Sequence, residues 1–340
     1  MRVYILKRLG QAVAVFWAAY TLSFILLSAL PGDSVTNRIQ NPEAQITPEA
    51  GRVMLEFYGL DRPLWQQYLH SLAGVFTGRL GYSLTSGKAV GELIGHALPS
   101  TVRLTAAGLA FGLVFAIVVA VAANYVPWRW LRELLGAAPA LFASVPTFVV
   151  GIVALQVLSF RLRLIPSVDD GSVAALLAPG ATLGLFVAAP LAQVFAASIR
   201  TTRGQPFVQV LRAKGAGAGY IFRKDVLRNS SLPVLTLLGL AVGELIAGSV
   251  VTESVFAREG IGQLTVGAVN TQDLPVVQGV VLLSTSAYVL VNLAVDVTYP
   301  FIDPRVLVDG RSPRTTKRVA RQRQSNAIAD PRPPVEVAMP

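Results

Sequence analysis

The chain has 340 residues, of which 53% are hydrophobic and 14% charged, with a formal net charge of +10 and no cysteine. Such an apolar composition excludes an ordinary soluble domain, and the missing cysteines exclude disulfides and thiolate metal sites. The basic residues collect at the ends of apolar runs and in the C-terminal tail. This distribution favours a membrane protein and argues against a nucleic-acid partner.

The N-terminal end carries the basic residues Arg2, Lys7 and Arg8, followed by an uncharged run from Leu9 to Leu30. A secretory signal peptide is the alternative, but its apolar core covers only ~7–15 residues and is followed by a small-residue cleavage site. We therefore predict an uncleaved first span whose N-terminus lies in the cytoplasm.

A polar segment with scattered apolar residues extends from Pro31 to about Pro99. We predict that it forms a small extracytoplasmic helical element rather than a strand-built domain. Both histidines of the chain, His70 and His96, lie in this segment. Because they are far apart and have no cysteine partners, we assign no metal site.

Five further apolar runs predict membrane spans, since ~20 residues at 1.5 Å per residue cross a hydrocarbon core of ~30 Å. They are Leu104–Tyr125, Leu134–Phe160, Gly171–Ile199, Leu232–Val251 and Val276–Val295. Internal prolines such as Pro146 and Pro190 are tolerated where neighbouring helices cover the freed carbonyl groups. The predicted fold class is an all-α, polytopic membrane protein with six transmembrane helices.

Six spans would place both termini in the cytoplasm, and most Lys and Arg residues do fall in the segments predicted to lie inside. We expect three parts: residues 1–98 with the first span and the extracytoplasmic segment, residues 99–305 with a five-span core, and residues 306–340 as a basic cytoplasmic tail. The Arg-, Pro- and Gln-rich tail cannot bury a core and is predicted to be disordered. Its charges could also contact anionic lipid.

The loop at 200–232 is basic and lies between two apolar runs, so we expect it in the cytoplasm. Pro206 suits the first turn of a helix, and Gly215 suits the position just after a helix end. A second short helix is predicted over 220–229, before Pro233 opens the next span. The loop therefore predicts two short helices separated by a glycine-rich break.

Phe207, Val210 and Leu211 share one face of the first short helix by their i, i+3, i+4 spacing. An apolar face exposed in the cytoplasm indicates a docking surface. A helix that lies on the lipid headgroups is the alternative, and the periodicity alone favours neither.

Short motifs punctuate the chain over nearly its whole length. They are Pro31-Gly32-Asp33, Gly59-Leu60-Asp61-Arg62-Pro63, Gly81-Tyr82-Ser83, Arg212-Ala213-Lys214-Gly215, Leu227-Arg228-Asn229, Leu232-Pro233 and the ending from Asp273 to Arg305. In this order they resemble the permease subunits of ATP-binding-cassette importers, in the dipeptide/oligopeptide branch. The resemblance implies a type I importer permease fold in the bacterial cytoplasmic (inner) membrane.

The resemblance also implies a role for the basic loop, which in this family holds the coupling helix that docks on an ATPase subunit. The candidate coupling residues are Phe207, Val210, Leu211, Ala213, Lys214 and Gly215. At Gln209, Val210 and Leu211 the chain departs from the Glu-Ala-Ala pattern of the family. The implied partners are a second homologous permease subunit, two cytoplasmic ATPase subunits and an extracytoplasmic substrate-binding protein.

The chain contains no G-x-x-x-x-G-K-[ST] phosphate loop, so ATP and Mg²⁺ are expected on partner chains and no cofactor is expected on this one. No Ser/His/Asp or paired-carboxylate grouping indicates an enzyme. Gly260-Ile261-Gly262 is interpreted as a glycine turn outside the membrane, because no βαβ context surrounds it.

Glu244 is the one acidic residue within a predicted span, which makes it a weak candidate for the substrate pathway. A protonated or water-facing carboxyl near a bend is the alternative. Gly239 and Gly243 form a G-x-x-x-G on the same predicted helix, which suits close packing with a partner subunit or within the chain. Asp296 is predicted to cap a helix or pair with Arg305.

The function predicted is a pore-forming permease subunit of an ATP-driven importer for peptides, which performs no covalent chemistry and works by alternating access. Nickel or another small solute is an alternative cargo in the same family. An ion-gradient-driven secondary transporter and a membrane scaffold are the rival classes.

Overall fold

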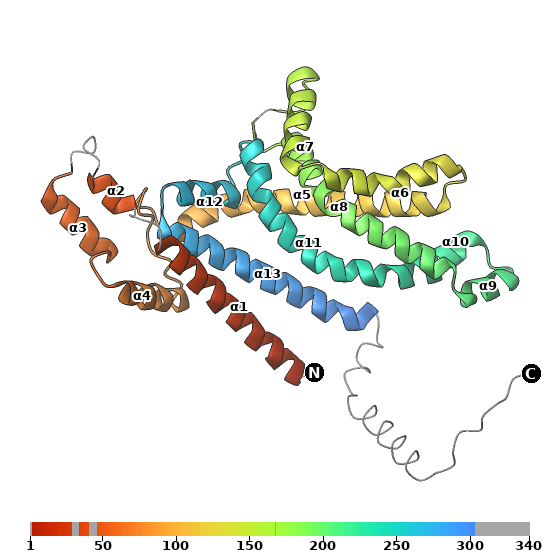
Figure 1. Cartoon of the computed structure of the whole chain (residues 1–340), viewed down its shortest axis with the longest axis horizontal. Coiled ribbons are helices and arrows are strands. Elements are labelled where there is room, and N and C mark those ends of the chain that lie inside the picture. Colours follow the sequence, from red (N-terminus) through yellow and green to blue (C-terminus); the bar gives the residue numbers. More distant parts are fainter. Residues whose placement is uncertain (1, 29–33, 41–45, 167, 303–340) are drawn as a thin grey trace, which may run out of the picture. The chain divides into compact units, whose positions relative to one another are not determined.

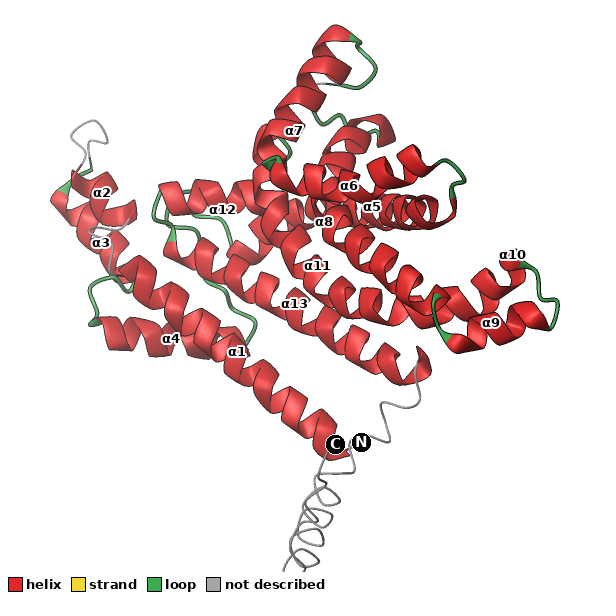
Figure 2. Cartoon of the chain, turned by 45° about the vertical axis from the view of Figure 1, so that its right-hand side comes forward, coloured by secondary structure: helices red, strands yellow, loops and turns green. Residues whose placement is uncertain are grey.

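The described part of the chain is built from helices joined by loops. The computed structural model describes residues 2–28, 34–40, 46–166 and 168–302. Within these ranges Figure 2 shows helices and loops, with an isolated antiparallel bridge between Tyr82 and Ala89. The elements are α1 (Arg2–Ser28), α2 (Ser34–Gln40), α3 (Pro48–Tyr58), α4 (Leu64–Phe76), α5 (Val90–Tyr125), α6 (Arg129–Ser144), α7 (Thr147–Ala154), the π-helix η2 (Leu155–Arg161), α8 (Val173–Arg203), α9 (Pro206–Ala213), α10 (Ala218–Ile221), the π-helix η3 (Phe222–Val226), α11 (Leu227–Val255), α12 (Ile261–Asn270) and α13 (Leu274–Ile302). The predicted all-α fold class is confirmed for this part of the chain.

The chain divides into two units, Met1–Val295 and Asp296–Pro340. Of the second unit the structure describes only the last residues of α13. The tail predicted over 306–340, and Arg305 as the predicted partner of Asp296, lie outside the described residues.

Among the residues that the structure describes, four helical runs are long and apolar enough to cross a membrane. They are Val90–Tyr125, Val173–Arg203, Ala218–Val255 and Leu274–Val291. Each contains or nearly contains one of the predicted spans. In α1, which is a helix of 27 residues, the apolar part over Val13–Leu26 is shorter than these runs.

The span predicted over 134–160 is not one straight helix. α6 and the α7–η2 run meet at an angle of 98°, and the pair counts as a fifth crossing if it is one broken span. The break lies at Val145 and Pro146, where Pro146 precedes the first residue of α7. Pro139 remains inside α6. Proline at the start of a helix loses no hydrogen bond, so Pro146 suits the break.

The second short helix predicted over 220–229 does not end at Asn229. Instead α10, η3 and α11 form one continuous run from Ala218 to Val255, with Pro233 inside α11. A proline inside a helix removes one backbone hydrogen bond, and neighbouring helices allow a membrane helix to tolerate that loss. The prediction that Pro233 separates the loop from the span is therefore wrong.

The centre of the first unit is the contact between α5 and α8, which glycines make close. An added Cβ at Gly184 would lie 2.4 Å from the carbonyl oxygen of Gly108, and one at Gly112 would lie 2.8 Å from that of Gly184. Gly180 likewise faces Ala107. Both helices thus carry a small-xxx-small pattern that allows their backbones to approach. Around this contact Leu104, Leu183, Val187, Leu191 and Leu245 form a buried cluster shared with α11.

Gly243, by comparison, packs within the chain. An added Cβ there would lie 3.0 Å from the ring of Tyr288 on α13, and one at Gly248 would lie 3.0 Å from Leu183. Of the two interpretations left open for this glycine pattern, internal packing accounts for Gly243.

The polar N-terminal segment is largely helical, as predicted, and it packs on α1. The ring of Tyr68 on α4 contacts that of Phe24 on α1 at 5.3 Å, and its hydroxyl lies 2.7 Å from Thr21 Oγ1. The hydroxyl of Tyr20 donates to Gln278 Oε1 on α13 over 3.3 Å. α1, α4 and the start of α13 are therefore joined by polar as well as aromatic contacts.

Candidate functional site

Two groups of residues at opposite ends of the long helices carry the candidate site. Figure 1 shows α9 and α10 beyond one end of α8 and α11, and α12 beside the other end. α9 lies at the end predicted to face the cytoplasm, and we describe it first.

α9 begins and ends where the sequence predicts. Pro206 is its first residue, and the N–H of Val208 donates to the carbonyl of Gln205 over 3.1 Å. After the last helical residue, Gly215 has a φ of +83°, a left-handed conformation that glycine adopts without strain. There the N–H of Ala216 donates to the carbonyl of Leu211 over 3.1 Å. The result is a two-turn helix with a glycine-dependent stop.

The inner side of α9 is anchored to the ends of the long helices. Val208 is buried, and Leu211 packs beside it. The buried cluster around Val208 contains Ala120, Phe195, Ile199, Ile221 and Val226. α9 therefore buries part of its apolar surface against its own chain, which the sequence did not predict.

The outer side of α9 exposes the other apolar residues. Phe207 is 38% exposed and Val210 is 52% exposed. Ala213, Lys214 and Gly215 are exposed as well. The predicted single face of Phe207, Val210 and Leu211 is thus corrected: the first two point outward and Leu211 is half-buried. An 8-residue helix offers apolar residues on both sides, so spacing alone could not separate the two faces.

Behind α9 an aromatic clasp joins the ends of α5, α8 and η3. The guanidinium of Arg203 lies 4.3 Å from the ring centroid of Tyr125, a cation–π contact, and also donates to the carbonyl of Asn124. The ring of Tyr125 in turn meets that of Phe222 edge-on at 5.0 Å. Asn124 Nδ2 donates to the carbonyl of Ala196 over 3.1 Å. A displacement of the loop would therefore be transmitted to two long helices.

At the opposite end, Glu253 is a fully buried carboxylate bound by the start of α12. Its Oε2 accepts hydrogen bonds from the backbone N–H groups of Gly262 (2.7 Å) and Gln263 (3.2 Å). Its Oε1 accepts one from Thr101 Oγ1 on α5 at 2.6 Å. Backbone N–H groups at a helix N-terminus favour an anion, so this carboxylate joins α5, α11 and α12.

The glycine turn explains how Glu253 reaches the helix. An added Cβ at Gly260 would lie 2.3 Å from the carboxyl carbon of Glu253, and one at Gly262 would lie 2.4 Å from Val250 Cα. Only glycine permits this approach. Glu253 lies on the same helix as Glu244, α11, and follows the end of the span predicted to finish at Val251. Glu244 itself is exposed and joins neither group of residues.

An ion pair between a buried arginine and a partly exposed aspartate lies near Glu253. The guanidinium of Arg258 is 2% exposed and lies 2.9 Å from Asp169 Oδ2, in the loop between η2 and α8. It also donates to the carbonyl of Ala175 over 3.4 Å. The ion pair therefore fastens this loop to the turn that precedes α12.

Asp273 fastens the N-terminal segment to the same end. Its carboxylate accepts hydrogen bonds from Ser83 Oγ (2.5 Å), Leu84 N (3.1 Å) and Thr85 N (3.2 Å). In the sequence, Asp273 opens the motif that ends at Arg305, and the motif alone predicts no contact for it. An acid directly before an apolar run is a helix-start signal, and it could have marked this residue.

Comparison with known proteins places these features in a family. Residues 112–308 match the family described as "Binding-protein-dependent transport system inner membrane component", and residues 1–105 match the N-terminal family of such membrane components. The glutathione transport system permease protein GsiC of Escherichia coli (strain K12) is 32% identical over 303 residues, which cover 89% of this chain and 98% of that protein. GsiC of Salmonella typhimurium is 33% identical over the same coverage.

The fold has a counterpart among solved structures. An inward-facing structure of the MetNI methionine ABC transporter matches with a TM-score of 0.51 and 18% identity, covering 62% of this chain and 96% of that one. At this identity the likeness concerns the fold alone.

Proposed function

The chain belongs to the family of binding-protein-dependent transport system inner membrane components, and from this premise we propose that it forms half of the translocation pathway of a peptide importer. As a membrane component of an ABC importer it is not the catalytic subunit. The observation that carries the proposal is the near full-length similarity to permease proteins of a glutathione transport system. Glutathione is a small peptide, so the cargo proposed is a short peptide.

The coupling residues are proposed from α9. Its outer side exposes Phe207 and Val210 while Val208 fixes its inner side to the long helices. An exposed apolar pair on an anchored helix suits a docking contact with a cytoplasmic ATPase subunit. Ala213, Lys214 and Gly215 border the same outer side and complete the proposed contact. ATP and Mg²⁺ would be bound by that partner.

Transmission through the membrane would follow the aromatic clasp. A movement of α9 would be transmitted to η3 through the buried cluster that they share. It would be transmitted to α5 and α8 through Tyr125 and Arg203. At the opposite end Glu253 and Arg258 join α5, α11, α12 and the η2–α8 loop. These helices would therefore reorient together.

A second, homologous permease subunit is proposed for the other half of the pathway. α6 and the α7–η2 run expose large apolar side chains to surroundings outside this chain. Among them are Trp130, Leu141, Phe148, Ile152 and Phe160, which are each between 49% and 65% exposed. Lipid and a partner subunit are the two surroundings that suit such a surface.

Six spans with both termini in the cytoplasm remain the proposed topology. α1 has 27 residues, and a helix of that length extends for ~40 Å, more than the ~30 Å of a hydrocarbon core. It would supply the sixth crossing if the bent pair is one broken span.

Cross-linking from α9 tests the proposal. The chain has no cysteine, so Phe207→Cys and Val208→Cys each introduce a single reactive site on adjacent residues. In membranes that contain the ATPase subunits and the binding protein, we expect Phe207→Cys to cross-link to an ATPase subunit. Val208→Cys, which is buried against the chain itself, should give little product.

Two results would contradict the proposal. One is cross-linking of Phe207→Cys to lipid alone, which favours a helix lying on the headgroups. The other is uptake into vesicles that is insensitive to vanadate and driven by a proton gradient, which favours a secondary transporter.

A further inference from the structure

A groove of about 420 Å³ lies between α1 and α4. Its volume falls within the range of ~300–1,000 Å³ typical of small-molecule sites. On α1 the lining residues are Thr21, Phe24, Ile25 and Ser28. They follow the i, i+3, i+4, i+7 spacing of one helix face, so a single side of α1 forms one wall of the groove.

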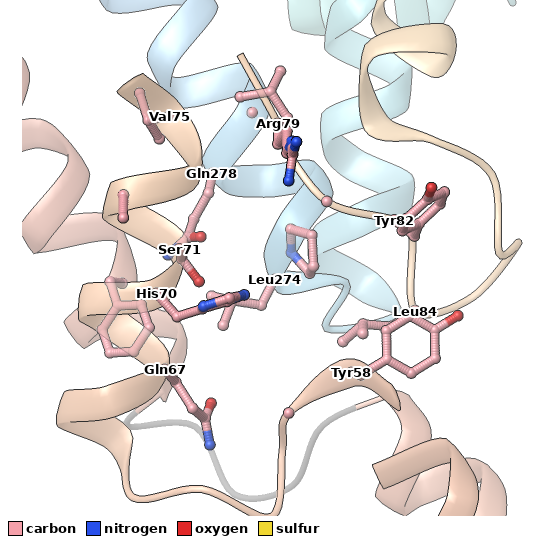
Figure 3. A pocket seen from close by; sticks show the side chains of 18 of the residues that line it. Tyr58, Gln67, His70, Ser71, Val75, Arg79, Tyr82, Leu84, Leu274 and Gln278 are labelled. Carbon is pink, nitrogen blue, oxygen red and sulfur yellow. The ribbon is translucent and has the colours of Figure 1, made fainter. Parts of the chain in front are cut away.

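The other wall is one of two different sides of α4. Leu64, Trp65 and Tyr68 line the groove, whereas Gln67 and His70 line a separate cavity that Figure 3 shows. Leu64 is 56% exposed and Trp65 is 63% exposed. α4 contains no Asp, Glu, Lys or Arg. A helix with an apolar side, a polar side and no carboxylate, ammonium or guanidinium group suits the boundary between membrane and water.

The polar groups of the groove are paired or closed off. The hydroxyl of Tyr68 lies 2.7 Å from Thr21 Oγ1, so these two groups satisfy one another. The hydroxyl oxygen of Ser28 is buried. Among the described residues, none that lines the groove is an acid or a base. The accessible lining is therefore hydrocarbon and aromatic surface, which favours an apolar ligand and disfavours a charged one.

The position of the groove on α1 identifies its surroundings. In the proposed topology the basic N-terminal end lies in the cytoplasm and α1 is the first span, so residues 21–28 form the outer part of that span. Over these residues the helix advances ~10 Å, about a third of a hydrocarbon core of ~30 Å. Leu22 and Leu26 belong to the same stretch outside the groove, and both are exposed. The groove is therefore continuous with a surface of α1 that faces the outer leaflet.

We propose that the groove binds one acyl chain of an outer-leaflet phospholipid, which lies between Ile25 of α1 and Trp65 of α4. Tryptophan and tyrosine are enriched where a membrane meets water, and Trp65 and Tyr68 both border the groove. The acyl chain would hold α4 in the outer leaflet against α1. The inference rests on α1 as the first span and goes beyond the proposed transport function.

Photo-cross-linking tests this site in the complete complex. The probe is a phosphatidylethanolamine that carries a diazirine in one acyl chain, in nanodiscs that contain the full-length chain and its partner subunits. After illumination, the peptides of this chain are analysed by mass spectrometry. We expect lipid adducts on Leu64 and Trp65 as well as on α1. A water-soluble diazirine should give fewer adducts on the same two residues of α4.

Two matched variants of α1 locate the binding in the groove. Ile25→Phe adds a ring to a residue that lines the groove, and Leu22→Phe adds the same ring to a residue outside it. Both residues are more than half exposed, so neither replacement disturbs the packed interior. Ile25→Phe should at least halve the lipid adducts on α4, because the ring takes up space that the acyl chain needs. Leu22→Phe should leave these adducts unchanged.

Three outcomes would overturn the inference: absence of lipid adducts on α4, labelling of α4 by the water-soluble probe in place of the lipid probe, or equal effects of Ile25→Phe and Leu22→Phe. Lipid adducts on α1 show independently that α1 is a span. Retained stimulation of ATP hydrolysis by the loaded binding protein in the same preparation would leave the proposed function standing. Failure of the inference and failure of the proposed function are thereby distinguished.

Discussion

Glu253 and Glu244 lie on the same helix, α11, but their surroundings are opposite. The carboxylate of Glu253 is fully buried and accepts hydrogen bonds from Thr101, Gly262 and Gln263. Glu244 is exposed and forms no hydrogen bond or ion pair with the residues that the structure describes. Removal of the two carboxylates should therefore have very different consequences.

We predict that Glu253→Ala destabilises the protein strongly and that Glu244→Ala does not. Loss of the Glu253 carboxylate leaves two backbone N–H groups and a hydroxyl without an acceptor, which costs about 3 kcal/mol or more in total. The measurement is the apparent melting temperature of each purified variant in the same detergent. Equal melting temperatures for the two variants would show that the hydrogen bonds accepted by Glu253 do not stabilise the fold.

The sequence could not identify Glu253 because its partners are distant in the chain. Hydropathy places the end of that span at Val251, whereas the helix continues to Val255. Thr101 is separated from Glu253 by 152 positions, and no local pattern links them. The glycines at 260 and 262 indicate a turn in the sequence. They are required because the carboxylate of Glu253 approaches this turn, and that approach depends on tertiary packing.

At the scale of elements, the residues that start and end a helix predicted the bounds of α9 well. Pro206 and Gly215 act through their own backbone conformations, so their effect is independent of the rest of the fold. Which side of α9 is buried depends on where α5 and α8 end, so the local sequence does not predict that Val208 is buried. Glycine patterns behave similarly: Gly239 and Gly243 were noticed in the sequence, while the closest helix contact uses Gly108 and Gly184.

We predict that Gly215→Val weakens the coupling between this chain and the ATPase subunits. The φ of +83° at Gly215 strains a β-branched residue, at about 1–2 kcal/mol, so the end of α9 should rearrange. Membrane insertion should be unaffected, but stimulation of ATP hydrolysis by the loaded binding protein should fall several-fold in the reconstituted complex.

The matched control is Gly217→Val. Gly217 has an extended backbone with a φ of −68°, and an added Cβ there meets no atom within 4 Å. This variant should keep stimulation near the level of the unchanged protein. Equal losses of stimulation in both variants would mean that coupling does not depend on the left-handed conformation of Gly215 after α9.

At the scale of the whole molecule, the number of crossings depends on the bent pair. Hydropathy treats residues 134–160 as one apolar run, but α6 and the α7–η2 run diverge by 98°. A broken span would cross the membrane, whereas a re-entrant pair would return to the side from which it entered. The apolar composition is the same in both cases, so hydropathy alone cannot decide between them.

Labelling of two lysine positions decides between a broken span and a re-entrant pair. Lys88 lies before α5 and Lys214 follows α9, and both are exposed. Between them are α5, the bent pair and α8. If the bent pair crosses once, three crossings separate the positions and they face opposite sides; if it is re-entrant, two crossings separate them and they face the same side.

We predict opposite sides, because the excess of Lys and Arg in the loop at 200–232 favours the cytoplasm and the segment before α5 is expected outside. In right-side-out vesicles a membrane-impermeant maleimide should label Lys88→Cys and not Lys214→Cys, and in inverted vesicles the pattern should reverse. The chain has no native cysteine, so each variant reports one position. Labelling of both variants from the same side would establish a re-entrant pair and remove the six-span topology.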